Sequence, residues 1–419
     1  MINKQKGTID LFGDEIKKWD YVSDIITAVA EKYNYGHIRI PLFEASELYH
    51  RGVGETSDIV RKETYDFKDK GDRSITLRPE GTAGVARAYI ENKMYGDVNQ
   101  PKKFFYIDTM YRYERPQAGR DREFTQFGFE LIGSNDPITD AEMISIPVNI
   151  YKMLGLNDIK VMINSIGDKD SRNKYKEALV DYLTPHLDLL CDDCKERIKS
   201  NPLRMLDCKV DRDSDIFRNV PNILDYLNDE SKARFETVKD YLSLLEIEYV
   251  VDAKLVRGLD YYDHTVFEIE VNEETLGAQN VLGGGGRYNG LITELDGPDT
   301  PAVGFAGGFG RLITALSDKN IPIEKSIDAY VMYVSDTEAQ TALYLSQELR
   351  MNGFKVELET LSRSLKAQFN QADRLNAKYL IMLNDADIDN EEVTIKDNKT
   401  HESEKVRIYD IVEYLDMHM

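Results

Sequence analysis

The stretch KLVRGLDYYDHTVFEIEV occupies residues 254–271, and LGGGGRYNGL follows at residues 282–291. The first stretch places an arginine, an aspartate and two tyrosines within six residues and then continues in a pattern typical of a strand. The second stretch contains four consecutive glycines, which would let the backbone approach a ligand closely. On spacing alone, an ordinary tight turn is the simpler interpretation of these glycines.

A second polar pattern lies on two strands further upstream. Residues 104–115 and residues 124–132 both alternate, and the alternation puts Arg112 on one face of the first strand and Gln126 and Glu130 on one face of the second. The connecting sequence RPQAGRD is rich in turn residues, so we expect an antiparallel hairpin. Its polar face would border a cleft, because buried charges are costly unless they are paired or contact a ligand.

The rest of the pattern predicts an α+β chain with two domains. Residues 12–32 have the periodicity of a helix, and residues from about 165 to 248 are helical and polar, like an insertion in a strand-rich body. A composition shift near residues 318–325 predicts a linker. Beyond the linker, strands alternate with helices as in a small parallel α/β domain. We therefore expect domains at 1–325 and 326–419.

Composition limits the class of protein. The chain has 419 residues, and none of its apolar runs approaches the roughly 20 residues that a membrane span requires. Its first residues lack the apolar core of a signal peptide, and three cysteines are too few for a disulfide framework, so we expect a cytoplasmic protein. The net charge of −22 argues against unspecific binding to nucleic acid, DNA included, but allows a specific RNA partner.

Any phosphate binding by this chain would depend on arginines. Neither GxGxxG nor GxxxxGK[ST] occurs, so the usual glycine-rich phosphate loops are not predicted. Arg112, Arg120, Arg257 and Arg311 lie in strand and loop contexts, and a guanidinium group matches the oxygens of phosphates and carboxylates. Surface salt bridges are the alternative interpretation of these side chains.

Several segments resemble the motifs of class II aminoacyl-tRNA synthetases, in the family's order. These segments are YGHIRIP at 35–41, LRPEGTA at 77–83, YRYERP at 111–116, RDREF at 120–124 and AVGFAGGFGRL at 302–312. The two stretches quoted first are similar to a pair of segments peculiar to histidyl-tRNA synthetases. LDCKVDR at 206–212 resembles part of that family's helical insertion, and RSLKAQFNQADRL at 363–375 resembles its anticodon-binding domain.

The resemblance implies a fold and a reaction. The fold would be a class II catalytic domain around a six- or seven-stranded antiparallel sheet, with a helical insertion and a C-terminal α/β anticodon-binding domain. The enzyme would be a ligase that activates histidine with ATP and transfers it from histidyl-adenylate to the 3′ end of tRNA(His). Mg²⁺ would accompany ATP, and Pro41 would lie at the interface of a homodimer.

Two other functions are compatible with the resemblance. One is a catalytically inactive, synthetase-like regulatory subunit of ATP phosphoribosyltransferase that senses histidine. Such a subunit would need neither the four arginines nor the C-terminal domain. The other is an RNA-binding paralogue that uses the anticodon domain without charging tRNA.

The resemblance also implies roles for individual residues. Arg112 and Arg257 would be the catalytic groups, with Arg112 at the α-phosphate of ATP and Arg257 near the same phosphate and the histidine carboxylate. Arg120 and Arg311 would hold the distal phosphates of ATP. Histidine itself would contact a larger set: Glu80, Thr82 and Gln126 at its α-ammonium group, Arg257 at its carboxylate, Glu130 and Tyr262 at its imidazole, and Tyr261 and Tyr288 around the pocket. The family pattern is broken at Gly310, where glutamate is usual, and at Asp121, where an aromatic residue is common.

The three cysteines form a separate group. Cys191, Cys194 and Cys208 lie within 23 residues of one another and of His186, and all four are of types that bind zinc. Their spacing fits no standard zinc module, and the family does not need zinc for its chemistry. We therefore predict no metal site.

Overall fold

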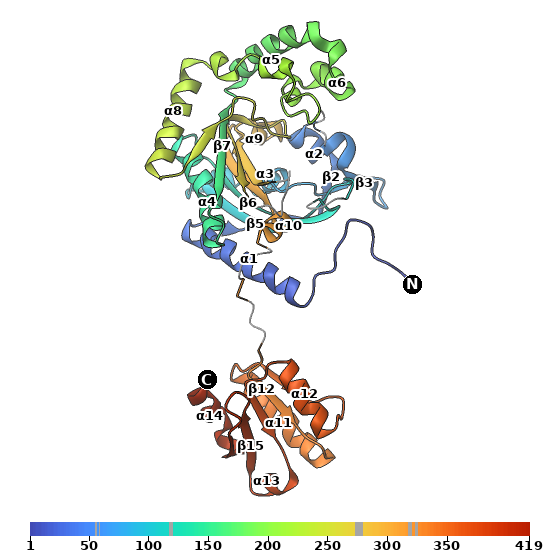
Figure 1. The fold of residues 1–419 in the computed structure, drawn as a ribbon. Helices are drawn as coiled ribbons and strands as arrows, with labels where there is room; N and C mark the ends of the chain where they lie inside the picture. The colour runs from blue at the N-terminus through green and yellow to red at the C-terminus, as the bar shows by residue number, and fades with distance from the viewer. Residues whose placement is uncertain (55–56, 58, 117–119, 273–279, 317–320, 323–325) are drawn as a thin grey trace. The chain divides into compact units, whose positions relative to one another are not determined.

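The computed structural model describes residues 1–54, 57, 59–116, 120–272, 280–316, 321–322 and 326–419. The chain divides into two compact units, Met1–Ile321 and Pro322–Met419. Figure 1 shows the first unit as a sheet surrounded by helices and the second as a smaller body of alternating strands and helices.

The first unit is built on a large central sheet. Its described strands are β1 (Gly36–His37), β5 (Lys102–Tyr111), β6 (Glu123–Ile132), β7 (Ile159–Ser165), β8 (Tyr249–Val251), β9 (Asp263–Val271), β10 (Val281–Arg287) and β11 (Ala302–Gly308). They lie in the order β1-β5-β6-β11-β10-β9-β7-β8, and the inner strands pair antiparallel (Figure 1). The expected hairpin is confirmed, since β5 and β6 pair from Lys102↔Ile132 to Tyr111↔Glu123. The two very short edge strands, β1 and β8, pair parallel to their neighbours and were not predicted.

One face of this sheet carries the main hydrophobic core. Phe127, Phe129 and Leu131 of β6 are fully buried there, as the alternation predicts. Helices α1 (Asp14–Lys32), α4 (Ile138–Met153), α8 (Asp229–Leu244) and α10 (Phe309–Ala315) contribute to the same core. Because residues alternate along a strand, Gln126 and Glu130 lie on the opposite face.

Between β7 and β8 the chain forms a mostly helical segment with its own core. It contains η3 (Thr184–Leu189), η4 (Pro202–Met205) and η5 (Ile223–Tyr226), and the helices α5 (Lys169–Leu183), α6 (Asp192–Ser200), α7 (Asp215–Arg218) and α8. Tyr175 and Leu179 of α5 pack there with Cys194 of α6, and all three are fully buried. Asp168 caps α5 by accepting the N–H of Ser171, as expected of a residue at a helix start.

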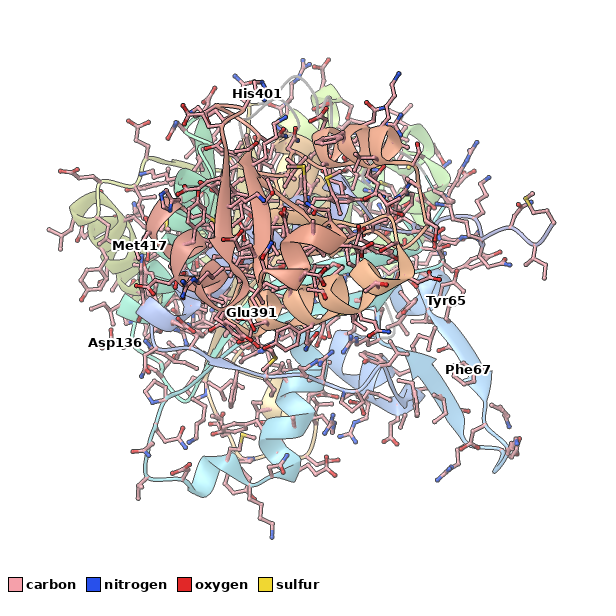
Figure 2. All side chains as sticks on the ribbon, turned by 90° about the horizontal axis from the view of Figure 1, so that it is seen from below. Tyr65, Phe67, Asp136, Glu391, His401 and Met417 are labelled. Carbon is pink, nitrogen blue, oxygen red and sulfur yellow. The ribbon has the colours of Figure 1, made fainter. Side chains whose placement is uncertain are left out.

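A small sheet precedes β5. Its described strands are β2 (Phe43–Ala45), β3 (Tyr65–Lys68) and β4 (Ser74–Leu77), in the order β2-β4-β3, and Figure 2 shows Tyr65 and Phe67 on β3. The neighbouring helices are α2 (Ser46–Val53), η1 (Ile59–Glu63), α3 (Thr82–Glu91) and η2 (Met94–Gly96), and α9 (Leu291–Glu294) follows β10. Helix α3 begins beside the polar face of β6.

The second unit has the predicted parallel core with an antiparallel extension. Its described elements are β12 (Ala329–Met332), α11 (Asp336–Met351), β13 (Val356–Leu358), α12 (Leu365–Arg374), β14 (Tyr379–Met382), α13 (Asp385–Asp389), β15 (Glu392–Asp397), β16 (Ser403–Arg407), η7 (Ile408–Asp410) and α14 (Ile411–His418). Strand β12 pairs parallel to β13 and β14, whereas β14, β15 and β16 pair antiparallel. Across the described parts of both units, no helix combines the length and apolar character that crossing a membrane requires.

Candidate active site

A cavity of about 900 Å³ lies beside the polar face of β6. Its walls include the start of α3, the loop between β5 and β6, residues 252–262, strands β9 and β10, and the start of α10. It brings together most of the predicted site residues: Glu80, Thr82, Arg112, Arg120, Gln126, Arg257, Tyr261, Tyr262 and Arg311. Segments up to about 230 residues apart in the sequence therefore share one hollow.

Three arginines concentrate positive charge in this cavity. Arg112 is fixed by donating from Nε to the carbonyl oxygen of Pro79 at 2.8 Å, and Arg120 pairs with Glu114 at 3.1 Å. Burial, followed by the charges of Arg120 and Arg112, lowers the pKa of Arg311 below its ordinary value. Positive groups that disfavour one another's charge are stabilised by an anion placed between them. The arrangement therefore suits a polyphosphate.

Arg257 lines the cavity and packs closely against Gly284 of β10, the strand that contains the four consecutive glycines. Its guanidinium forms an ion pair with Glu268 of β9. A Cβ added at Gly284 would lie 2.7 Å from Arg257 Nη1 and 2.6 Å from the carbonyl oxygen of Phe267. The interpretation of the glycines as a tight turn is thus wrong: Gly283–Gly286 belong to β10, paired on both sides, and Gly284 leaves room for Arg257.

Glu130 lies behind the cavity wall, in a fully buried polar cluster. It accepts hydrogen bonds from the hydroxyl groups of Thr82, at 2.7 Å, and of Tyr288. Burial raises the pKa of Glu130 to about 8, against the lowering effect of the hydrogen bonds from Tyr288 and Thr82 and with a smaller contribution from the nearby charge of Glu80. A Cβ at Gly304 would lie 1.9 Å from Glu130 Oε2, so only glycine leaves space for this carboxyl group. Among the described residues, Thr82 bridges Glu130 to the cavity.

Glu80 and Gln126 are also held in place by hydrogen bonds. The Glu80 carboxylate accepts the backbone N–H groups of Thr82 and Ala83, each at 2.8 Å, at the beginning of α3. A negative charge at a helix N-terminus is stabilised by the exposed N–H groups. Gln126 Oε1 accepts the N–H of Gly81 at 3.2 Å. Each side chain therefore presents a fixed acceptor near the cavity.

Two tyrosines, Tyr261 and Tyr262, line the cavity beside Tyr288 of the polar cluster around Glu130. The rings of Tyr261 and Tyr262 have centroids 4.7 Å apart, and Tyr261 contacts Tyr288 edge-on at 5.6 Å. Aromatic rings of this kind bury a ligand while keeping a hydroxyl group available for hydrogen bonding. The site thus has a cationic region and a buried acidic region side by side.

Some cavity residues were not predicted from the sequence. Phe124 faces the guanidinium of Arg112 with its ring centroid 5.1 Å from Cζ, and Glu268 pairs with Arg257. Trp19 of α1 and a segment of the helical insertion, Leu206–Asp213, also supply wall residues. The alternating pattern of the strands that contain Phe124 and Glu268 can be read from the sequence and could have indicated these two residues. No pattern in the sequence indicates that the helical insertion lies beside the cavity.

The two departures from the family pattern both lie at the cavity. Gly310 lines it, and nothing in the described structure comes within 4 Å of a Cβ added there. Asp121 also lines it, and burial raises the pKa of that carboxyl group. Neither departure touches the Glu130 cluster.

Comparison with known proteins identifies the class and then the family. Residues 7–312 match a family model described as histidyl-tRNA synthetase, and residues 328–418 match one described as an anticodon binding domain. A histidine–tRNA ligase of Bacillus cytotoxicus is 49% identical over 412 residues, which is 98% of this chain and 97% of the relative. One of Macrococcus caseolyticus is 49% identical over 417 residues, covering 99% of both chains.

A solved structure agrees with these relatives. The crystal structure of apo S. aureus histidyl-tRNA synthetase matches with a TM-score of 0.84 at 41% identity, over 99% of this chain and 100% of that one. The catalytic fold and the anticodon-binding unit are those of a class II aminoacyl-tRNA synthetase. The chain belongs to the histidyl-tRNA synthetase family.

Proposed function

We propose that this chain is a histidine–tRNA ligase that works in two steps. The carboxylate of histidine attacks the α-phosphorus of ATP, which gives histidyl-adenylate and pyrophosphate. The terminal ribose hydroxyl of tRNA(His) then takes the histidyl group and releases AMP. The observation that carries this proposal is one cavity that contains a cluster of arginines and is lined by Thr82, whose hydroxyl group contacts the buried carboxyl group of Glu130.

The arginines act by position and charge. Arg112 and Arg257 contact the α-phosphate and the attacking carboxylate, where negative charge develops as the bond forms. Arg120 and Arg311 bind the distal phosphates, and a polyphosphate there offsets the burial and the repulsion from Arg120 and Arg112 that lower the pKa of Arg311. Bringing two reactants together in a fixed geometry supplies much of the rate enhancement in such a reaction.

The buried region selects histidine. The imidazole ring contacts Glu130 and Tyr262, and Tyr261 and Tyr288 close the pocket around it. The α-ammonium group donates to Glu80, Thr82 and Gln126, which are acceptors fixed by hydrogen bonds. A pocket that satisfies both ring nitrogens rejects an apolar side chain of similar size by roughly 10⁴-fold, because its polar groups would otherwise remain unpaired.

Mg²⁺ accompanies ATP in this proposal. Glu114 and Glu268 place carboxylate oxygens beside the phosphate-binding arginines, and Mg²⁺ prefers oxygen ligands. Each carboxylate is already paired with an arginine, so the phosphates provide the main ligands for the ion. A bound ion would neutralise part of the charge on the triphosphate.

The partners follow from the family and from the surface. The anticodon-binding unit, residues 328–418, contacts tRNA(His), and the enzyme works in the cytoplasm without a membrane or DNA partner. The chain forms a homodimer through the surface at Pro41, where Leu42 and Phe43 remain 44% and 55% exposed in a single chain. Light scattering on the purified protein measures this assembly directly.

Two assays test the proposal. Histidine-dependent exchange of pyrophosphate into ATP should occur, and tRNA(His) should accept labelled histidine. A chain that binds histidine without exchange would instead be a regulatory subunit, and one that exchanges without charging tRNA would contradict the second step. The four cavity arginines and the second unit favour the ligase, because a histidine sensor requires neither.

A further inference from the structure

Four side chains of the helical insertion meet in a compact cluster away from the arginines. These are Cys191, Cys194, Cys208 and Asp211, whose three Sγ atoms and one carboxylate oxygen all lie within 4.8 Å of one another. Cys194 is fully buried, and Cys208 and Asp211 are only 3% and 7% exposed. The three cysteines are free thiols.

Two of the spacings between these atoms match the edges of a tetrahedral metal site. Zinc binds sulfur at about 2.3 Å and oxygen at about 2.0–2.2 Å, so a tetrahedron has S···S edges of about 3.8 Å and S···O edges of about 3.5–3.7 Å. Cys191 Sγ and Cys208 Sγ are 3.6 Å apart, and Cys208 Sγ lies 3.7 Å from Asp211 Oδ2. Both distances agree with edges of such a tetrahedron to within a few tenths of an ångström.

The backbone holds the ligands in place from two directions. Cys191 is the N-cap residue of α6 and Cys194 lies in the first turn of this helix, so the two thiols point to the same side. Cys208 and Asp211 come from the turn-rich segment after η4. The N–H of Cys191 donates to Asp211 Oδ2 at 3.0 Å, which fixes that carboxylate and joins the two segments.

We propose that Cys191, Cys194, Cys208 and Asp211 bind one Zn²⁺ ion as a closed structural site. Three thiolates favour zinc over the hard cations Mg²⁺ and Ca²⁺, and four protein ligands leave no position open for catalysis. When the ion binds, each thiol forms an S–Zn bond and loses its proton to the solvent, so three protons are released per ion.

The proposed zinc site differs from the sequence-based expectation in two respects. A metal site was not predicted, and the possible fourth ligand was His186 rather than Asp211. In the structure the ring of His186 packs against Tyr182, with centroids 5.6 Å apart, and His186 is not part of the cluster. The inference rests on residues of the insertion alone and is independent of the proposed ligase activity.

The site would also fix one wall of the active cavity. The segment between Leu206 and Asp213 carries two of the four ligands, and other residues of the same segment, Lys209 and Arg212 among them, line that cavity. A zinc ion that ties this segment to α6 would hold the wall in one conformation. Removing the ion should therefore loosen the insertion.

The test uses the full-length chain, purified under reducing conditions from medium containing zinc. Elemental analysis should find one zinc per chain, and replacement by Co²⁺ should give the thiolate charge-transfer and visible absorption bands of a tetrahedral cobalt site. Cys194→Ser and Asp211→Asn should each lose most of the bound metal. The matched control is His186→Ala, which should keep it.

A chelator on the wild-type protein tests the site without any substitution. Thiols protected from a thiol-reactive dye should become reactive when zinc is removed, and re-added zinc should restore their protection. Fewer than about one zinc in ten chains after exposure to zinc would overturn the proposal. So would a disulfide between Cys191 and Cys208 in the reduced preparation, or loss of zinc from His186→Ala.

Discussion

Replacing Glu130 by glutamine should change the pH dependence of histidine binding. Burial raises the pKa of Glu130 to about 8, so this carboxyl group carries a proton in the free protein at neutral pH. The imidazole of free histidine has a pKa near 6.5 and is mostly neutral under the same conditions. We expect the complex to form with one proton shared between the two groups, without net uptake or release.

The magnitude follows from counting protons on each side. Below about pH 6.5 both Glu130 and the imidazole carry a proton, and one of the two must leave on binding. Above about pH 8 neither group carries a proton, and one must be taken up. The dissociation constant therefore rises about tenfold per pH unit as the pH falls below about 6.5 and as it rises above about 8. A glutamine at this position does not titrate, so the dissociation constant of the variant should not rise above about pH 8. At neutral pH the variant also loses a charge-assisted hydrogen bond of about 1.5–3 kcal/mol, which weakens histidine binding roughly 10- to 100-fold.

Calorimetric titration of histidine from about pH 6 to about pH 9, in buffers of different ionisation heat, measures both affinity and proton exchange. The ratio of the variant's dissociation constant to that of the wild type cancels the titration of histidine itself. This ratio should stay constant to about pH 8 and then fall about tenfold per unit. Glu413→Gln, an exposed change in the second unit, is the matched control and should follow the wild type.

Two results would refute this reasoning. A ratio that rises up to about pH 8 and then levels off would mean that Glu130 binds neutral imidazole as a carboxylate. A ratio that stays constant over the whole range would mean that Glu130 does not titrate there. Either result would leave the position of Glu130 intact but change its role in binding.

Folding stability provides an independent check of the same group. The pKa of Glu130 is about 8 in the folded chain against an ordinary 4.5, so the native state keeps a proton that the unfolded state loses. The contribution of Glu130 to the free energy of unfolding therefore falls as the pH rises from about 4.5 to about 8, by about 1.4 kcal/mol per unit and about 5 kcal/mol in all. Denaturant titrations at a series of pH values should show that the free energy of unfolding falls less steeply with rising pH in Glu130→Gln than in the wild type.

Three further changes test other parts of the structure. Arg257→Ala should lower pyrophosphate exchange by roughly 10²- to 10³-fold without unfolding the chain, because a preorganised positive group is lost at the reacting phosphate; near-normal exchange would exclude its proposed role. Arg287→Ala should reduce the free energy of unfolding by about 1.5–3 kcal/mol, measured with denaturant, because the fully buried Asp140 loses its charge-assisted hydrogen bond from Arg287 at 3.0 Å and keeps its ion pair with Arg234 at 2.6 Å; a loss under about 1 kcal/mol would contradict that estimate. Gly310→Ala should raise the stability by up to about 1 kcal/mol, because the residue lies in α10 with open space at Cβ, and destabilisation in a thermal melt would show that the space is needed.

Elements with a clear periodicity were predictable from the sequence. The hairpin of β5 and β6, the helix α1 and the parallel strands β12 and β14 all follow from alternating or helical patterns of apolar residues. The polar face of β6 was predictable for the same reason. These patterns are local, since each depends on residues that are neighbours in one element.

Features without a local pattern were missed. Helix α3 buries most of its residues, so its sequence lacks the polar face that marks an amphipathic helix. Asp211 lies on a turn-rich segment and reaches the cysteines through folding rather than through spacing. The burial of the Glu130 side chain also depends on β11, because Gly304 of that strand leaves space for the Glu130 carboxyl group.

The glycine strand β10 also limits how this site could evolve. A Cβ at Gly283, Gly284, Gly285 or Gly286 would come within 2.0–2.6 Å of a neighbouring atom, so none of these four glycines can be replaced without moving its neighbours. Selection that alters the preferred amino acid must therefore act on other residues of the site, such as its tyrosines and carboxyl groups. An engineer who wants this scaffold to accept a histidine analogue should randomise those residues and leave the glycines untouched.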